Sequence, residues 1–338
     1  MGKEHADFIG ENIDRLITVE LKNLGMPHDI VRAMYEAARE EGGGRPLTTR
    51  AAEGLLREVS RGDVVFVVTG AGYPPGMPNG ESDGPPGAAA IARALYWGLG
   101  AVPVFVCEQQ HAGPIVASSE AATLMLRPRE AAMKGFGAAL ETAPGTSAEV
   151  ADWAASLYET YKPKALISVE RLGPAADGIV YNATGIPKGP ESGIVDLAPI
   201  FYEAEKRGVF SIGLGDHGNE MGFGRIREAV ARIMPKGETL ATVVKTDVLI
   251  PCLMSNWGAY GIEAALAFLL QDASLIHTPQ QEERTIRKCL DAGGLEAFWC
   301  STAFIVDSCD GESSMAIVQL LNNMVRLALM KPGRGVAH

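Results

Sequence analysis

Residues 64–87 read VVFVVTGAGYPPGMPNGESDGPPG, and this stretch decides the fold. The run Val64 to Val68 is continuously apolar and mostly β-branched, which is typical of a strand buried on both faces. A loop of Gly, Pro and Asn follows, carries the acids Glu81 and Asp83, and ends in Pro-Pro-Gly before a helical run. Asp83 therefore stands where an N-cap belongs. The two carboxylates either cap this helix or hold a cation or an ammonium group.

Apolar strands alternate with helical patterns after this stretch, which is typical of a parallel sheet with right-handed crossovers. We expect four more strands, at Val102–Cys107, Ala165–Val169, Val209–Leu214 and Leu240–Lys245. Residues 112–161 are expected to be mostly helical. The predicted fold class is α/β, a three-layer, mostly parallel Rossmann-like sheet with an N-terminal helical segment.

The first 60 residues show only helical spacing and no motif that indicates chemistry. One helix is expected to begin with Thr48 as its N-cap and to run to Val59. We therefore expect a helical segment, residues 1–60, packed on an α/β domain, residues 61–331, or on another subunit of a homo-oligomer.

Composition excludes several classes of protein. The chain has 338 residues, 47% hydrophobic and 21% charged, which is typical of a soluble globular protein. Its net charge of -11 without a basic cluster argues against nucleic-acid partners. Five cysteines without a CxxC pair indicate reduced thiols rather than a zinc site. The sequence shows no signal peptide and no apolar run of spanning length, so we expect a cytoplasmic protein with no membrane partner.

Acidic residues follow the expected strands at the carboxyl edge of the sheet, where open α/β sheets bind ligands. They are Glu81 and Asp83, Glu170, Asp216 with Glu220, and a late pair, Asp310 and Glu312. Each could singly be a helix cap. Crowded carboxylates, however, repel one another unless they are protonated or are bridged by a cation or an amine. The sequence therefore predicts a divalent metal, Mg²⁺, Mn²⁺ or Ca²⁺, bound by Glu81, Asp83, Glu170 and Asp216.

The segment GLGDHGNEMGFG, residues 213–224, groups four polar residues that we place at the start of a helix, Asp216, His217, Asn219 and Glu220. The segment matches GxGxxG only loosely and lacks the usual acid after the next strand, so no nucleotide cofactor is expected. His217 could donate a proton near neutral pH or simply face solvent. Asp216 is expected to be a ligand or base rather than a helix cap, because Asn219 could cap that helix equally well.

Three further polar positions each have a functional and a structural interpretation. Arg171 could bind a substrate carboxylate with two of its nitrogens, or it could pair with Glu170 or a surface acid. Asn256 could cap the helix that it starts, or its amide could reach the cleft. His111 follows a strand end, and we interpret it as an ordinary loop residue rather than a ligand.

Four strings of the sequence resemble the glutamate cyclase-like domain family, over about residues 60 to 330. They are TGAGYPPGMPNGESDGPPGAAAIARAL, LISVERLGPAADGIVYN, GVFSIGLGDHGNEMGFGRI and SNWGAYGIEAAL. The family's acidic loop pattern is met by Glu81 to Gly87, its Glu-Arg-x-Gly turn by Glu170 to Gly173, and its Gly-Asp-x-Gly-Asn-Glu motif by Gly215 to Glu220. Two features depart from the family pattern, namely His217 within the last motif and a divergent part around residues 299–310.

This resemblance implies a lyase that closes D-glutamate, or a related amino acid, to 5-oxo-D-proline by intramolecular dehydration. Such a reaction needs a base, and a Lewis acid or proton donor for the departing oxygen. We assign catalysis to Glu170, Asp216, His217 and Glu220, and substrate binding to Arg171, Asn219, Asn256, Gly70 and Gly72. The alternative is a divalent-metal-binding protein, or a metal-dependent hydrolase that acts on another small molecule.

Overall fold

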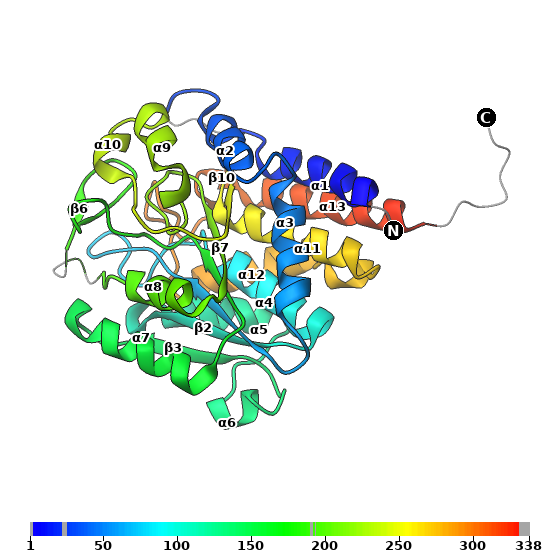
Figure 1. The fold of residues 1–338 in the computed structure, drawn as a ribbon, viewed down its shortest axis with the longest axis horizontal. Helices are drawn as coiled ribbons and strands as arrows, with labels where there is room; N and C mark the ends of the chain where they lie inside the picture. Colours follow the sequence, from blue (N-terminus) through cyan, green and yellow to red (C-terminus); the bar gives the residue numbers. More distant parts are fainter. Residues whose placement is uncertain (1–2, 22–25, 190–191, 193, 331–338) are drawn as a thin grey trace, which may run out of the picture.

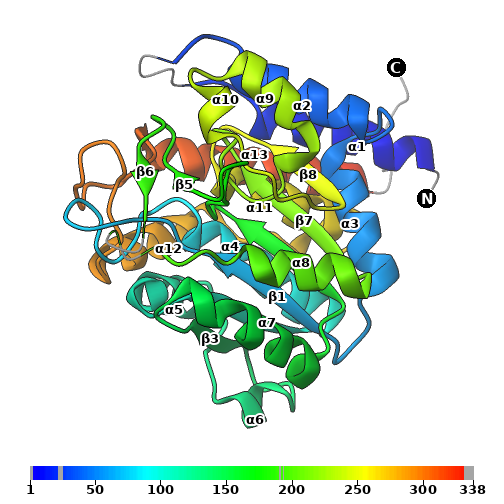
Figure 2. The same cartoon turned by 60° about the vertical axis from the view of Figure 1, so that its left-hand side comes forward.

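A single six-stranded sheet forms the centre of the molecule (Figures 1 and 2). The computed structural model describes residues 3–21, 26–189, 192 and 194–330. Every strand of this sheet runs parallel to its neighbours. In sheet order the strands are β3 (Ala139–Ala143), β2 (Val102–Glu108), β1 (Val64–Thr69), β4 (Ala165–Val169), β7 (Phe210–Gly215) and β8 (Val248–Pro251). The α/β class predicted from the sequence is confirmed.

Both faces of the sheet are covered by helices because the side chains of β1 alternate between two apolar cores. Val65 and Val67 belong to the larger core, and Phe66 and Val68 to the smaller one. The larger core is formed with α1 (Lys3–Ile17), α2 (Ile30–Glu41), α3 (Leu47–Glu58), α4 (Pro85–Ala94), α5 (Ala112–Ala121), α9 (Arg227–Ile233), α10 (Gly237–Leu240), α11 (Ser255–Leu269), α12 (Pro279–Asp291) and α13 (Gly311–Leu329). The smaller core is formed with α6 (Arg129–Ala132), α7 (Ser147–Tyr161) and α8 (Ala198–Arg207).

The strand order creates a crevice between β1 and β4, because the chain leaves β1 toward β2 on one side and later returns to β4 on the other. Open α/β sheets bind their ligands at such a switch point. Thr69 pairs with Val169, so the two strands end level with each other. The loops that follow them, from Gly70 and from Glu170, therefore start side by side.

Two short antiparallel pairs flank this edge of the sheet. One is β5 (Val180–Tyr181) with β6 (Pro187–Lys188), and the other is β9 (Ile305–Val306) with β10 (Cys309–Asp310). Each pair closes a loop whose tip reaches the end of the central crevice. Both are too short for independent stability, so their position depends on packing against the main domain.

Two local predictions were wrong, and a third was incomplete. Residues 112–161 are mostly helical as predicted, in α5, α6 and α7, but β3 also forms a half-buried edge strand there. The strand predicted at Leu240–Lys245 is instead the end of α10 and an irregular segment whose Val243 amide donates to Pro174, while residues 248–251 pair with β7. Thr48 is not an N-cap, since α3 begins at Leu47 after Pro46. The two apolar segments have similar strand propensity, and packing against neighbouring strands determines which of them joins the sheet.

The N-terminal helices belong to the same core as the rest of the chain. Helices α1 and α3 pack on α11, α2 packs on β8, and the Leu253 amide donates to the Ile17 carbonyl at 2.9 Å. Residues 1–60 thus cover one face of the α/β domain, as far as the structure describes them. Over the described ranges, none of the helices combines the length and the hydropathy needed to cross a bilayer.

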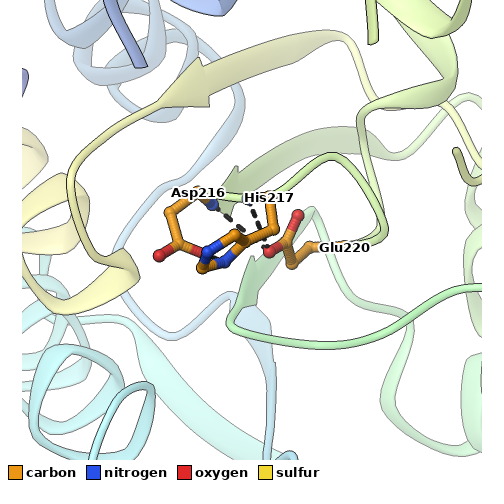
Figure 3. Close-up of side chains that lie close together, drawn as sticks. All are labelled: Asp216, His217 and Glu220. Atoms are coloured by element: carbon orange, nitrogen blue, oxygen red, sulfur yellow. Dashed lines mark hydrogen bonds and ion pairs between the residues drawn. The ribbon is translucent and has the colours of Figure 1, made fainter. Parts of the chain in front are cut away.

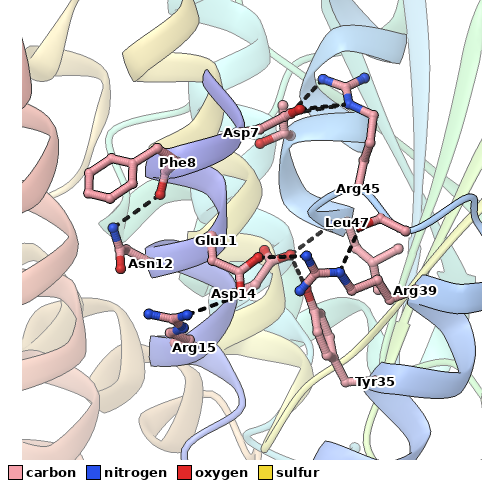
Figure 4. A network of polar contacts seen from close by, with 12 residues as sticks. Asp7, Phe8, Glu11, Asn12, Asp14, Arg15, Tyr35, Arg39, Arg45 and Leu47 are labelled. Carbon is pink, nitrogen blue, oxygen red and sulfur yellow. Dashed lines mark hydrogen bonds and ion pairs between the residues drawn. The ribbon is translucent and has the colours of Figure 1, made fainter. Parts of the chain in front are cut away.

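A buried carboxylate joins these three helices (Figure 4). Asp14 of α1 is 1% exposed and accepts hydrogen bonds from the Tyr35 hydroxyl at 2.6 Å, the Leu47 amide at 2.6 Å and the Thr48 hydroxyl. Burial raises the pKa of Asp14 to about 6, although these hydrogen bonds oppose the shift. The Thr48 side chain, expected to cap its own helix, serves this carboxylate instead.

We expect Asp14→Asn to lower the free energy of unfolding by about 1–3 kcal/mol at pH 7, because an amide NH₂ cannot accept from these donors. Tyr35→Phe removes a single donor and should cost less. Urea denaturation of the two variants and the wild type measures both differences. An Asp14→Asn protein with the wild-type midpoint would show that the carboxylate does not hold the three helices together.

Candidate functional site

A cavity of about 260 Å³ lies where β1, β4 and β7 end. Six carboxylates from four separate segments line it, and they are Glu81, Asp83, Glu170, Asp216, Glu220 and Asp307. Among the described residues, no lysine or arginine lines the wall. The remaining wall is largely apolar and includes Ala71, Met77, Leu172 and Phe298. The cavity is thus small, strongly acidic and partly apolar. Such a cavity suits a small molecule that carries a positive charge or binds together with a cation.

The structure brings together most of the residues that the sequence singled out. The four predicted metal ligands, Glu81, Asp83, Glu170 and Asp216, line the cavity together with His217, Asn219, Glu220 and Gly72. Gly70, Arg171 and Asn256 do not line it. The roles of the lining residues stay predictions, whereas the other three have contacts that explain them otherwise.

The late acidic contribution comes from Asp307 and not from the predicted pair Asp310 and Glu312. Asp310 is exposed and caps α13 by accepting from the Ser313 amide at 2.7 Å, and Glu312 is also exposed. Asp307 is buried and lies in the turn between β9 and β10, with a φ of 45°. It follows the apolar pair Ile305–Val306, so the acid-after-strand pattern holds here too, but the two-residue strand gave too short a signal.

Asp83 and Asn256 cap each other's helices. The Asp83 carboxylate accepts from the Ser255 amide at 2.8 Å and the Asn256 amide at 2.9 Å, at the start of α11. The Asn256 side-chain oxygen accepts from the Gly84 amide at 3.0 Å and the Gly87 amide at 2.7 Å, at the start of α4. Both capping predictions therefore named the wrong helix. The exchange fixes Asp83 at the cavity wall and excludes the Asn256 amide from it.

Gly87 is required for this close approach of the two helices. A Cβ atom at this position would lie 2.7 Å from the Asn256 Cα atom, which is closer than two carbon atoms can pack. The Pro-Pro-Gly sequence at the start of α4 therefore supplies both the first helical positions and the contact with α11.

The loop after β7 folds around the carboxylate of Glu220 (Figure 3). Glu220 accepts from the backbone amides of Asp216 at 3.3 Å, His217 at 3.0 Å and Gly218 at 2.8 Å. The His217 Nδ1 atom lies against an Asp216 oxygen. No helix begins here, because α9 starts only at Arg227, and the predicted helix start was wrong. Asp216 accordingly caps no helix.

Crowding changes the protonation of two carboxyl groups in the cavity. Burial, followed by the charges of Asp216, Glu220 and the two acids of the β1 loop, raises the pKa of Glu170 well above its usual value. Burial and the neighbouring Asp216 raise the pKa of Glu220 to about 7. Glu170 also has a left-handed φ of 48°, and the Ser255 hydroxyl donates to its Oε2 atom at 2.6 Å. Burial and crowding thus favour the protonated form of both carboxyl groups, and the pKa of Glu220 lies near neutral pH.

Two groups of side chains could each hold a metal ion. In each group, one ligand atom per residue lies within 4.8 Å of the others, and the groups are Asp83 with Asp216 and Asp307, and Asp216 with His217 and Glu220. Asn219 adds an amide whose Nδ2 donates to the Tyr181 carbonyl at 2.8 Å, while its buried Oδ1 has no hydrogen-bond donor in the described part of the chain. The group of three aspartates offers only oxygen ligands, which suit Mg²⁺, Mn²⁺ or Ca²⁺, whereas the other group includes a nitrogen of His217. Two predicted ligands, Glu81 and Glu170, are in neither group.

Arg171 is buried and paired with an acid that the sequence did not indicate. Its guanidinium donates to both carboxylate oxygens of Glu108 at 2.5 and 2.8 Å, and Arg171 is 1% exposed. Burial alone would raise the pKa of Glu108, but the charges of Arg171 and His111 lower it to about 2. Arg171 therefore pairs with neither Glu170 nor a surface acid, and it does not line the cavity where a substrate carboxylate could reach it. His111 is also not an ordinary loop residue, because it is buried with Nδ1 3.2 Å from Glu108 Oε2.

Sequence comparisons show the family to which the chain belongs. A family profile described as D-glutamate cyclase-like, C-terminal, matches residues 20–322, and the chain belongs to this family. A human protein, mitochondrial D-glutamate cyclase, is 31% identical over 195 residues. These residues are 57% of this chain and 30% of the human protein, so the match spans less than a third of that relative's length.

We expect Glu170→Gln to raise the melting temperature of the metal-free protein, and to raise it more at pH 8 than at pH 5. The folded state holds a proton on Glu170 that the unfolded state releases above its ordinary pKa, so wild-type stability falls as the pH rises, and glutamine removes this loss.

Thermal melts in the presence of a chelator measure this difference. The exposed Glu312→Gln variant is the matched control, and its melting temperature should follow that of the wild type at both pH values. A Glu170→Gln protein that melts at or below the wild type at pH 8 would contradict the crowding of charge in this cavity.

Proposed function

We propose that this protein is a lyase that interconverts D-glutamate, or a closely related amino acid, and the corresponding 5-oxo lactam. The observation that carries the proposal is the small acidic cavity at the switch point of the sheet, in a chain that belongs to the D-glutamate cyclase-like family. The name of the human relative, D-glutamate cyclase, supports the same reaction. Its mitochondrial location is a property of that protein, and a cytoplasmic homo-oligomer remains a prediction from the sequence.

Ring closure moves two protons from nitrogen to oxygen. The substrate ammonium must first lose a proton, because only the neutral amine can attack the side-chain carboxyl carbon. The new C–N bond forms, a C–O bond breaks, and the departing oxygen leaves as water after it has taken up two protons. An enzyme for this reaction therefore needs a proton acceptor near the nitrogen and a proton donor near the oxygen.

The two perturbed carboxyl groups can fill these roles. The raised pKa of Glu170 favours its protonated form, which can donate to the departing oxygen. Glu220 has a pKa of about 7, so it can accept a proton from the ammonium near neutral pH. His217, in contact with Asp216, is the histidine on the cavity wall and can relay a proton to solvent.

Charge balance favours a divalent cation in the same cavity. Glutamate carries two carboxylates, and an acidic wall without lysine or arginine among its described residues would repel them. Asp83, Asp216 and Asp307 would hold the cation, with the Asn219 oxygen as a further ligand. When bound, the cation would supply the Lewis acid that polarises the substrate carboxyl group. The apolar wall would receive the methylene groups.

Purified protein incubated with D-glutamate and Mn²⁺ should form 5-oxoproline, and L-glutamate should react more slowly. Glu170→Gln should lower the rate by about 10²–10⁴-fold, the usual contribution of a general acid. Glu312→Gln again provides the control and should keep the wild-type rate. Chiral chromatography of the products measures all of these. No product from either enantiomer with Mg²⁺, Mn²⁺ or Ca²⁺ would refute the proposed reaction.

Cation binding can be tested separately by replacing two aspartates of one short segment, Asp307 and Asp310. Asp307→Asn should weaken Mn²⁺ binding by at least about 10-fold, because it removes a charged oxygen ligand. Asp310→Asn should leave Mn²⁺ binding unchanged, because asparagine caps α13 about as well as aspartate. Calorimetric titration with Mn²⁺ compares the two variants. Equal affinities would place the cation elsewhere or exclude it.

A further inference from the structure

Arg171 contacts the ends of several strands from one buried position. Its NH1 atom donates to the Gly70 carbonyl at 2.9 Å, just after β1, and its NH2 atom donates to the Val195 carbonyl at 2.5 Å, before α8. Both nitrogens bind Glu108 at the end of β2, and the Val195 amide donates to the same carboxylate at 3.1 Å. One guanidinium therefore joins the β1 loop, the end of β2 and the segment that precedes α8.

The main chain around Arg171 completes the connection to β7. Its carbonyl accepts from the Met221 amide at 2.8 Å, and the Gly173 amide donates to the Asn219 carbonyl at 2.8 Å. These bonds tie the segment after β4 to the loop that carries Asp216 and Glu220. Residues of the β1, β4 and β7 loops, which provide five of the six acids of the cavity, thus meet at Arg171.

Glu170 is the immediate neighbour of Arg171 and has the left-handed φ of 48°. A non-glycine residue adopts this conformation only where its surroundings impose it. Asn and Asp tolerate the region best, and glutamate has no such advantage. The fixed position of Arg171 on one side, and the Ser255 hydroxyl bond to Glu170 on the other, impose this backbone and direct the carboxyl group into the cavity.

We propose that Arg171 and Glu108 are a positioning pair that holds Glu170 and the acidic loops in the geometry needed for cation binding and turnover. This inference rests on the proposed function and adds two residues that do not touch the cavity. The guanidinium is essential, because a planar fork can bind two carboxylate oxygens and two carbonyls at once. A lysine ammonium keeps the charge but cannot reach four acceptors arranged in this way.

The test compares Arg171→Lys with Asp14→Asn in the full-length chain. Both changes disturb a buried polar network, but Asp14 lies among the N-terminal helices and does not line the cavity. Mn²⁺ affinity, kcat and KM for D-glutamate are measured well below both melting temperatures. We expect Arg171→Lys to weaken Mn²⁺ binding and to lower kcat by about 10–100-fold each, as is usual for groups that orient ligands. Asp14→Asn should keep wild-type values.

A second variant covers the case in which Arg171→Lys does not fold. Glu108→Leu combined with Arg171→Met replaces the buried ion pair by apolar groups, a change that proteins often tolerate. We expect this double variant to fold and to show the same losses. Wild-type Mn²⁺ affinity and kcat in either folded variant would overturn the positioning role but leave the proposed function intact. A wild-type protein without Mn²⁺ binding or turnover would overturn both.

Discussion

Mutual repulsion among buried carboxylates is the constraint on which the structure of this site depends. Six acids line a cavity of about 260 Å³, and the wall includes no lysine or arginine among the described residues. Like charges at such spacing cannot all remain ionised, so protons or a cation must compensate them. The raised pKa values of Glu170 and Glu220 indicate compensation by protons. The carboxylates of Asp83, Asp216 and Asp307 are suited to compensation by a cation.

The fold keeps these acids together by binding each to fixed donors. Asp83 accepts from the first amides of α11, where the helix dipole favours negative charge, and Glu220 accepts from three successive backbone amides. The parallel sheet brings the loops to one edge, and Arg171 connects them without lining the cavity. Repulsion between the carboxylates destabilises the fold, and burial of the large apolar core offsets this cost. A bound ligand can relieve the repulsion that stays in the site.

Much of this arrangement could be predicted from the sequence, because acids after apolar strands lie on one sheet edge in any parallel α/β fold. That rule located Glu81, Asp83, Glu170 and Asp216. The rule missed Asp307, whose strand is two residues long. The apolar pattern also predicted a strand at residues 240–245, whereas the strand lies at residues 248–251. The Asp83–Asn256 exchange and the Arg171–Glu108 pair join residues far apart in the chain. Local patterns cannot specify such partners, since capping and pairing rules name a residue's chemistry but not its distant neighbour.

The central claim is that the acidic cavity takes a divalent cation together with a small dicarboxylate or its lactam. Anomalous diffraction from crystals grown with Mn²⁺ and D-glutamate tests it most directly. The account predicts a manganese peak within coordination distance of Asp83, Asp216 and Asp307, with ligand density extending toward Glu170. A cavity without an anomalous peak at saturating Mn²⁺, or a peak only at surface acids, would contradict it.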